Sequence, residues 1–191
     1  MPYVDTHQVE SPDMSMTTRR RLIASLLAGG AVVATAPLFA GRASAASTGG
    51  GSPHRDAADN AALNACLERE SRMVATYRKA VVGLTEHDLA AMTLILDHHV
   101  AYADALKGYL AVDVVNPSTA PLASPSGSIA GIARQLAALE DQTATIHTDT
   151  IGTIKGLDAA TLLASIVTVE ARHAAALELI GGASPMTAVG N

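Results

Sequence analysis

The sequence predicts an all-α fold, an antiparallel four-helix bundle with a long crossover between its second and third helices. The composition favours helices, because aromatic residues make up only 3% of the 191 residues and tryptophan is absent, whereas strands are rich in aromatic and β-branched side chains. Four stretches repeat apolar residues at alternating steps of three and four, the spacing of one helix face. The third observation is a connection, residues 114–128, that is too long for a simple hairpin.

Residues 1–45 resemble a bacterial signal peptide. Thr-Arg-Arg-Arg at residues 18–21 is followed by a moderately apolar run over residues 22–40 and by Ala-Ser-Ala at residues 43–45. The paired arginines are typical of the twin-arginine class. A membrane anchor is the alternative reading, but two glycines and a proline interrupt the apolar run, so we expect no stable anchor.

We therefore expect export by the twin-arginine machinery, cleavage near Ala45, and a periplasmic or extracellular mature protein. Proteins of this class resemble one another in being exported already folded, often around a cofactor, which favours a bound metal. Met14 and Met16 are alternative starts to Met1, because the segment before Thr18 is longer than such a signal needs.

The net charge and the single cysteine limit which partners the chain can bind and how its fold can be stabilised. The formal net charge is −5, so the chain has no basic footprint for nucleic acid. Cys66 is the only cysteine, so no disulfide can form within the chain, and an exported protein must rely on packing or on a metal. The sequence is compatible with a homodimer but does not specify the oligomeric state.

The mature chain begins with a flexible leader, residues 46–55, which is too small and polar to pack. The bundle itself is predicted over residues 56–182, and a disordered tail over residues 183–191. The first helix runs from Asp56 toward Gly83, and Glu70 occupies a core-facing position on its apolar stripe.

The second helix is expected at about residues 86–112. Its apolar stripe includes His99 and Tyr102, which are three residues apart and so leave the same face of the helix. The third helix is expected at about residues 129–154, with Glu140 as a single acid among leucines.

Asp158 is predicted to cap the start of the fourth helix, which ends at Gly181-Gly182. Glu170 and His173 stand three residues apart on its apolar stripe and point toward the core. A Glu-x-x-His pair that faces into a bundle is the half-site from which carboxylate-bridged two-metal centres are built.

The two halves of the bundle repeat the same polar pattern. Glu70 is followed seven residues later by Tyr77, and Glu140 is followed seven residues later by His147. The pair on the second helix has the same offset as the Glu-x-x-His pair on the fourth. Such an internal duplication indicates a two-metal site with two similar ends.

At this point the chain resembles the ferritin-like four-helix bundles of bacteria that carry a twin-arginine signal, over roughly residues 56–182. The residues that carry the resemblance are Leu63-Asn64, Glu70, Tyr77, His99, Leu106, Leu139-Glu140 and Val169-Glu170-Ala171-Arg172-His173-Ala174. The resemblance implies two irons held by glutamates and histidines that react with oxygen or peroxide.

Carried over by position, the resemblance implies metal ligands on all four helices: Glu70, His99, Tyr102, Glu140, Glu170 and His173. His99 stands where a second acid is usual, and Tyr102 where a second histidine is usual. We therefore expect either one firmly held ion or an asymmetric pair. Tyr77 and His147 are expected to hold the adjacent acids without touching the metal.

Several ordinary interpretations compete with the metal site. Arg72, Arg134 or Arg172 could pair with the buried acids instead. His98 is expected at the surface, because it points about 100° away from His99. Asp97 is expected on the solvated face, and Cys66 to behave as a small buried hydrophobe.

The expected function is an exported protein that binds iron, as one or two ions, or else manganese, in the bundle core. A ferroxidase-like or peroxide-consuming oxidoreductase activity is compatible with such a site. The alternative is a non-catalytic bundle that acts as a binding or stress-protective module and keeps a degenerate metal site.

Overall fold

The computed structural model describes residues 56–184, with the side chains of residues 86–88 left out. The predicted signal peptide, the leader and most of the predicted tail lie outside the described residues. Within the described part the chain forms four α-helices: α3 (Asn60–Ala80), α4 (Glu86–Leu110), α5 (Ile129–Ile151) and α6 (Leu157–Ile180). Short 3-10 helices, η1 (Ala57–Asp59) and η2 (Ala111–Asp113), precede α3 and follow α4.

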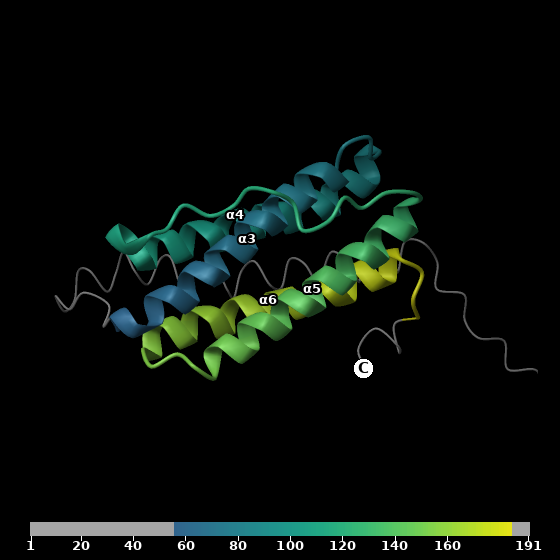
Figure 1. Cartoon of the computed structure of the whole chain (residues 1–191). Coiled ribbons are helices and arrows are strands. Elements are labelled where there is room, and N and C mark those ends of the chain that lie inside the picture. Colours follow the sequence, from purple (N-terminus) through teal and green to yellow (C-terminus); the bar gives the residue numbers. More distant parts are fainter. Residues whose placement is uncertain (1–55, 185–191) are drawn as a thin grey trace, which may run out of the picture.

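The four helices form two hairpins that pack against each other (Figure 1). The closest pairs are α3 with α4 and α5 with α6, and α3 also contacts α5 while α4 contacts α6. Residues 114–128 run along the length of the bundle from the end of α4 to the start of α5, so these two helices point in the same direction (Figure 1). The predicted crossover bundle is therefore confirmed.

The crossover segment is held against α3 by side chains of that helix. Asn64 accepts a hydrogen bond from the amide of Val115 at 2.7 Å and donates to the carbonyl of Asp113. Thr76 accepts from the amide of Leu122 at 2.9 Å. The connection is thus an ordered strap along the bundle.

Two helix boundaries differ from the prediction. The third helix ends at Ile151 rather than near residue 154, because Gly152 takes the C-cap position. The N-cap of α6 is Gly156, and Asp158 lies in the first turn of the helix, so its predicted capping role is wrong. Asp59 supplies the missing acceptor: its carboxylate accepts from the amides of Lys155 and Gly156 at 3.0 and 2.8 Å.

The interior has two apolar layers, one toward each end of the bundle. The first includes Leu63, Cys66, Tyr102, Leu106, Leu163 and Ile166. The second includes Met73, Tyr77, Met92, Ile95, Leu136 and Leu177. Buried acids and histidines from all four helices lie at sequence positions between these layers, so the apolar core encloses a polar one.

Among the described helices, α6 alone is long and apolar enough to cross a membrane. In the bundle, 44% of its apolar window is buried, and its inward face carries Glu170 and His173. These features suit the core helix of a bundle.

Candidate metal centre

The predicted ligand side chains come together in the middle of the bundle. Glu70 on α3, His99 on α4 and Glu140 on α5 are each 0% exposed, as are Glu170 and His173 on α6. The helical period explains the convergence, since each of these side chains continues an apolar stripe that faces the core. Together with His147 on α5 they form two clusters of three residues, in each of which one ligand atom per residue lies within 4.8 Å of the others.

The first cluster consists of His99, Glu140 and His173. Nε2 of His99 lies 2.9 Å from Oε1 of Glu140, and Nδ1 of His173 lies 3.3 Å from its Oε2. The hydroxyl of Tyr77 donates a short hydrogen bond to the same carboxylate. Glu140 is therefore fully engaged by groups of the protein.

The second cluster consists of Glu70, His147 and Glu170. Nδ1 of His147 lies 3.1 Å from Oε1 of Glu170, and its Nε2 lies 3.6 Å from Oε1 of Glu70. The other oxygen of Glu70 lies 2.7 Å from Nδ1 of His99, which joins the two clusters. This cluster has two carboxylates and one imidazole, whereas the first has one carboxylate and two imidazoles.

The internal repeat seen in the sequence appears as a cross-pairing of α3 and α5. Tyr77, seven residues after Glu70, bonds to Glu140. His147, seven residues after Glu140, faces Glu70. Each single acid thus meets the residue that follows the other acid by two helical turns, as an approximate two-fold axis requires.

The first cluster and its neighbours are held by strong electrostatic pairing. Burial lowers the pKa of His99, but the carboxylates of Glu140 and Glu70 outweigh it and hold that pKa well above its usual value. Burial raises the pKa of Glu140, yet His99 and His173 bring it below its usual range. Burial, followed by the charge of Glu140, raises the pKa of the Tyr77 hydroxyl. His99 is therefore a cation that donates from both ring nitrogens.

In the second cluster, attraction between opposite charges offsets the cost of burial less completely than in the first. Burial lowers the pKa of His147, but the neighbouring Cys66 and the carboxylates of Glu170 and Glu70 raise it to about 10. Burial, which the hydrogen bond from His147 only partly offsets, raises the pKa of Glu170 to about 7. For Glu70, burial acts upward, whereas His99 and His147 outweigh it and bring its pKa below the usual value.

Buried polar atoms without a partner test whether a cation fits. In the second cluster, Oε1 of Glu70, Oε1 of Glu170 and Nε2 of His147 have no hydrogen bond within the described part of the chain. Buried polar atoms without a hydrogen bond cost free energy, and a divalent cation bound among these three residues would satisfy them. The donor set of the second cluster therefore fits a metal ion.

Within the described part of the chain, none of the three arginines proposed forms an ion pair with these acids. Arg72 donates to the carbonyl of Ala120 and Arg134 to that of Gly181. Among residues 56–184, the ion pairs of the cluster carboxylates are all with histidines. A histidine can lose its proton and bind a metal through the freed nitrogen, which an arginine cannot do.

The structure contradicts the predicted position of His98 and places His147 among the candidate ligands. His98 is not at the surface: it is 5% exposed, and its Nδ1 lies 2.8 Å from Nε2 of His173. Burial, then the neighbouring His173 and His99, lower its pKa to about 4, so the ring is neutral. His147 was expected to hold an acid without touching the metal, which stays a prediction; the structure groups it with Glu70 and Glu170 as a candidate ligand. Its offset of seven from Glu140 was the signal for this.

Tyr102 lies beside the clusters, and its role as a ligand stays a prediction. Its ring is 5.9 Å from that of His99 and 6.5 Å from that of His173, measured between centroids. Its buried hydroxyl has no hydrogen-bond partner in the region described. Burial raises the pKa of this hydroxyl well above its usual value.

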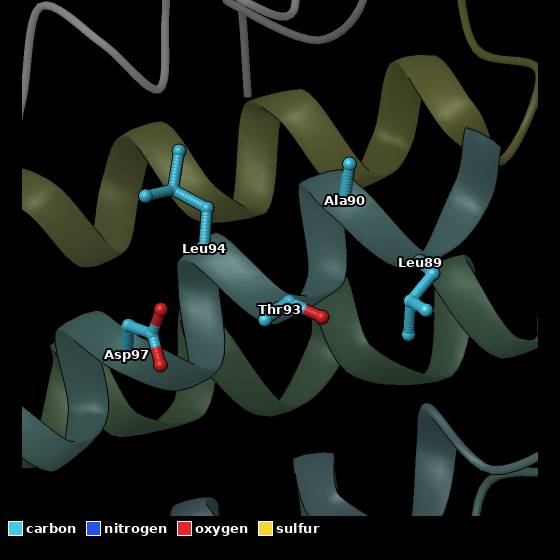
Figure 2. Close-up of a pocket in the computed structure, with 5 residues that line it drawn as sticks. All are labelled: Leu89, Ala90, Thr93, Leu94 and Asp97. Carbon is cyan, nitrogen blue, oxygen red and sulfur yellow. The ribbon is translucent and has the colours of Figure 1, made fainter. Parts of the chain in front are cut away.

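A shallow surface depression on α4 is separate from the clusters. Figure 2 shows its five lining side chains, Leu89, Ala90, Thr93, Leu94 and Asp97, all from this one helix. Asp97 is exposed, as predicted. With one carboxylate and mainly apolar walls, the depression lacks a ligand set for a metal.

Comparison with known proteins gives one match. The family model described as a ferritin-like domain matches residues 54–182. Neither the curated proteins nor the solved structures include a significant match to the chain.

Proposed function

Because this chain belongs to the family of ferritin-like domain proteins, we propose that its bundle core binds iron, with manganese as the next choice. The observation that carries the proposal is the second cluster, where two carboxylate oxygens and one imidazole nitrogen are buried and make no hydrogen bond within the described part of the chain. Mixed carboxylate and imidazole ligands suit both metals.

The chain's residues have distinct roles in this proposal. Glu70, His147 and Glu170 hold the more firmly bound ion, because an ion there displaces the proton of His147 but no hydrogen bond of Oε1 of Glu70, Oε1 of Glu170 or Nε2 of His147. Glu140, His99 and His173 hold a second, weaker ion, because an ion there must displace hydrogen bonds that already satisfy Glu140. Tyr77 helps to fix Glu140 by donating to Oε1, the oxygen that also lies beside Nε2 of His99. Tyr102 is an additional oxygen ligand.

Iron held in the core supplies one-electron redox chemistry toward oxygen or peroxide, which makes a ferroxidase-like or peroxide-consuming oxidoreductase the proposed activity. The protein contributes a water-poor environment, since all six cluster residues are 0% exposed. His99 and His147, whose pKa values are raised, also hold protons that metal binding would release, because a ring nitrogen must lose its proton to coordinate.

Metal analysis of the purified chain tests the proposal. The wild-type chain is loaded anaerobically with Fe(II) or Mn(II), desalted, and compared with a Glu70→Gln, Glu170→Gln double variant. Glu68→Gln is the matched control, since this exposed acid lies on the same helix as Glu70. We expect metal in the wild type and the control and little in the double variant. Equal, near-zero metal in all three would refute the proposal.

Oxygen uptake after addition of Fe(II) tests the activity separately. The wild-type chain should consume oxygen faster than the double variant at the same iron concentration. A chain that binds iron but oxidises it no faster than buffer would leave a binding function and exclude the oxidase.

A non-catalytic binding or stress-protective module is the second candidate. The first cluster favours it, because Tyr77, His99 and His173 already satisfy Glu140 as a hydrogen-bonded core would. This candidate requires that chelators leave the melting temperature unchanged, whereas an ion bound only by the folded state must raise it. A marked fall in melting temperature on chelation would exclude it.

We further propose that the protein acts outside the cytoplasm after twin-arginine export. The support is the arginine-rich start, the apolar run and the Ala-Ser-Ala stretch of residues 18–45. Replacing Arg19 and Arg20 by lysine should retain the uncleaved chain in the cytoplasm, as cell fractionation would show. Unchanged export of this variant would contradict the assignment.

A further inference from the structure

His98 makes a direct contact with one of the proposed ligands. Its Nδ1 lies 2.8 Å from Nε2 of His173, and the two rings are nearly parallel, with an interplanar angle of 12°. His98 comes from α4 and His173 from α6, and both are buried. The contact therefore joins two helices directly beside the first cluster.

This contact decides which nitrogen of His173 is available to the cluster. An imidazole has two ring nitrogens, and a ligating ring uses one for the metal and the other as an N–H donor. In His173, Nε2 faces His98, while Nδ1 lies 3.3 Å from Glu140 inside the first cluster. The ring cannot turn over without losing both contacts.

We propose that His98 is a positioning residue, which orients His173 so that Nδ1 binds the ion of the first cluster and Nε2–H donates to Nδ1 of His98. This inference rests on the proposed function. It adds a residue that contacts no ion but sets the orientation of a ligand, His173, that does.

The chemical nature of the partner has a consequence for the site. Metal-bound histidines often donate their second N–H to a carboxylate, which makes the ring more basic. His98 is an imidazole rather than a carboxylate, so it orients His173 without adding negative charge. The first cluster then offers one carboxylate and two imidazoles, which favours a divalent ion over a trivalent one.

Two substitutions at His98 separate its hydrogen bond from its volume. His98→Phe keeps a planar ring but removes the acceptor nitrogen, whereas His98→Gln keeps an acceptor oxygen. Zn(II) is the probe, because it is diamagnetic and permits nitrogen NMR of the His173 ring, assigned with a His173→Gln spectrum. Met92→Ala is the control for a general loss of packing, since Met92 is fully buried on the same helix.

We expect Zn(II) to shift Nδ1 of His173 in the wild type. His98→Phe should weaken the weaker of the two Zn(II) sites by about 10- to 100-fold, the usual effect of losing such a partner. His98→Gln should largely restore it. Met92→Ala should lower the melting temperature but leave the His173 spectrum and Zn(II) affinity unchanged.

Three results would overturn the inference. Wild-type affinity in His98→Phe with Zn(II) still on Nδ1 of His173 would show that His98 does not position the ring. Coordination through Nε2 in the wild type would contradict the geometry. A wild-type chain that binds no Zn(II) in the core would overturn the proposed function and this inference together, whereas the first two results leave the proposed function standing.

Discussion

Two tyrosines of the core have opposite hydrogen-bonding states. The hydroxyl of Tyr77 donates to Glu140, whereas the hydroxyl of Tyr102 is buried without a partner among residues 56–184. A buried hydrogen bond to a charged group stabilises a fold, and a buried unpaired hydroxyl costs free energy. The two residues therefore provide a matched pair of substitutions.

Tyr77→Phe should destabilise the metal-free protein by about 1.5–3 kcal/mol, because Glu140 loses a charge-assisted hydrogen bond. Tyr102→Phe should cost nothing or stabilise it, because no bond is lost. Urea unfolding in the presence of a chelator measures both changes. Equal losses for the two variants would contradict the assigned hydrogen bonds.

The raised pKa of His147 determines how the free energy of unfolding should depend on pH when no metal is bound. Its pKa is raised to about 10 in the folded chain, above the usual 6.5. A raised folded pKa adds stability that is complete below pH 6.5 and is lost as pH rises toward 10. Urea unfolding between pH 6.5 and 10, with chelator, should show this decline, and His147→Asn should reduce it. A flat wild-type profile would count against the charged ring.

At the scale of single residues, the sequence predicted the acids better than the histidines. Glu70, Glu140 and Glu170 were identified because a lone acid on an apolar stripe is conspicuous. His98 was misplaced, because one stripe was assumed for α4. In a bundle this helix faces the three other helices, so His99 reaches α3 and α5 while His98 reaches α6.

At the scale of elements, Asp59 links the start of one hairpin to the turn of the other. Its carboxylate accepts the amides of Lys155 and Gly156, just before α6. Because Asp59 is 3% exposed, loss of the carboxylate leaves these amides without their acceptor. The contact fixes the register between α3 and α6.

Asp59→Ala should therefore destabilise the protein by about 1–3 kcal/mol and increase hydrogen exchange at the amide of Gly156. Asp56→Ala is the control: this residue caps only the 3-10 turn, through the amide of Ala58, and should cost about 1 kcal/mol or less. Chemical denaturation combined with hydrogen-exchange NMR measures both. Similar losses in the two variants would refute the link.

The existence and order of the helices were predictable, but some ends were not. Apolar periodicity identified all four helices and the crossover between α4 and α5. The end of α5 and the cap of α6 were misplaced, because Gly152 ends the helix locally and the acceptor at Gly156 comes from Asp59, far away in the sequence. A long-range acceptor leaves no signal in the local pattern.

At the scale of the whole molecule, the bundle encloses a polar layer between two apolar ones. Three carboxylates and three histidines at 0% exposure are costly unless they pair with one another or with a cation. The first cluster is paired internally, while the second retains unsatisfied ligand atoms. The sequence predicted either one firmly held ion or an asymmetric pair, and the two clusters differ in their ligand types.

A crystal structure of the Mn(II)-loaded chain, with anomalous scattering data, tests the central claim most directly. The account predicts a strong anomalous peak bounded by Glu70, His147 and Glu170, and a weaker one or none beside His173. Anomalous peaks confined to surface carboxylates, with the core hydrogen bonds unchanged, would contradict it.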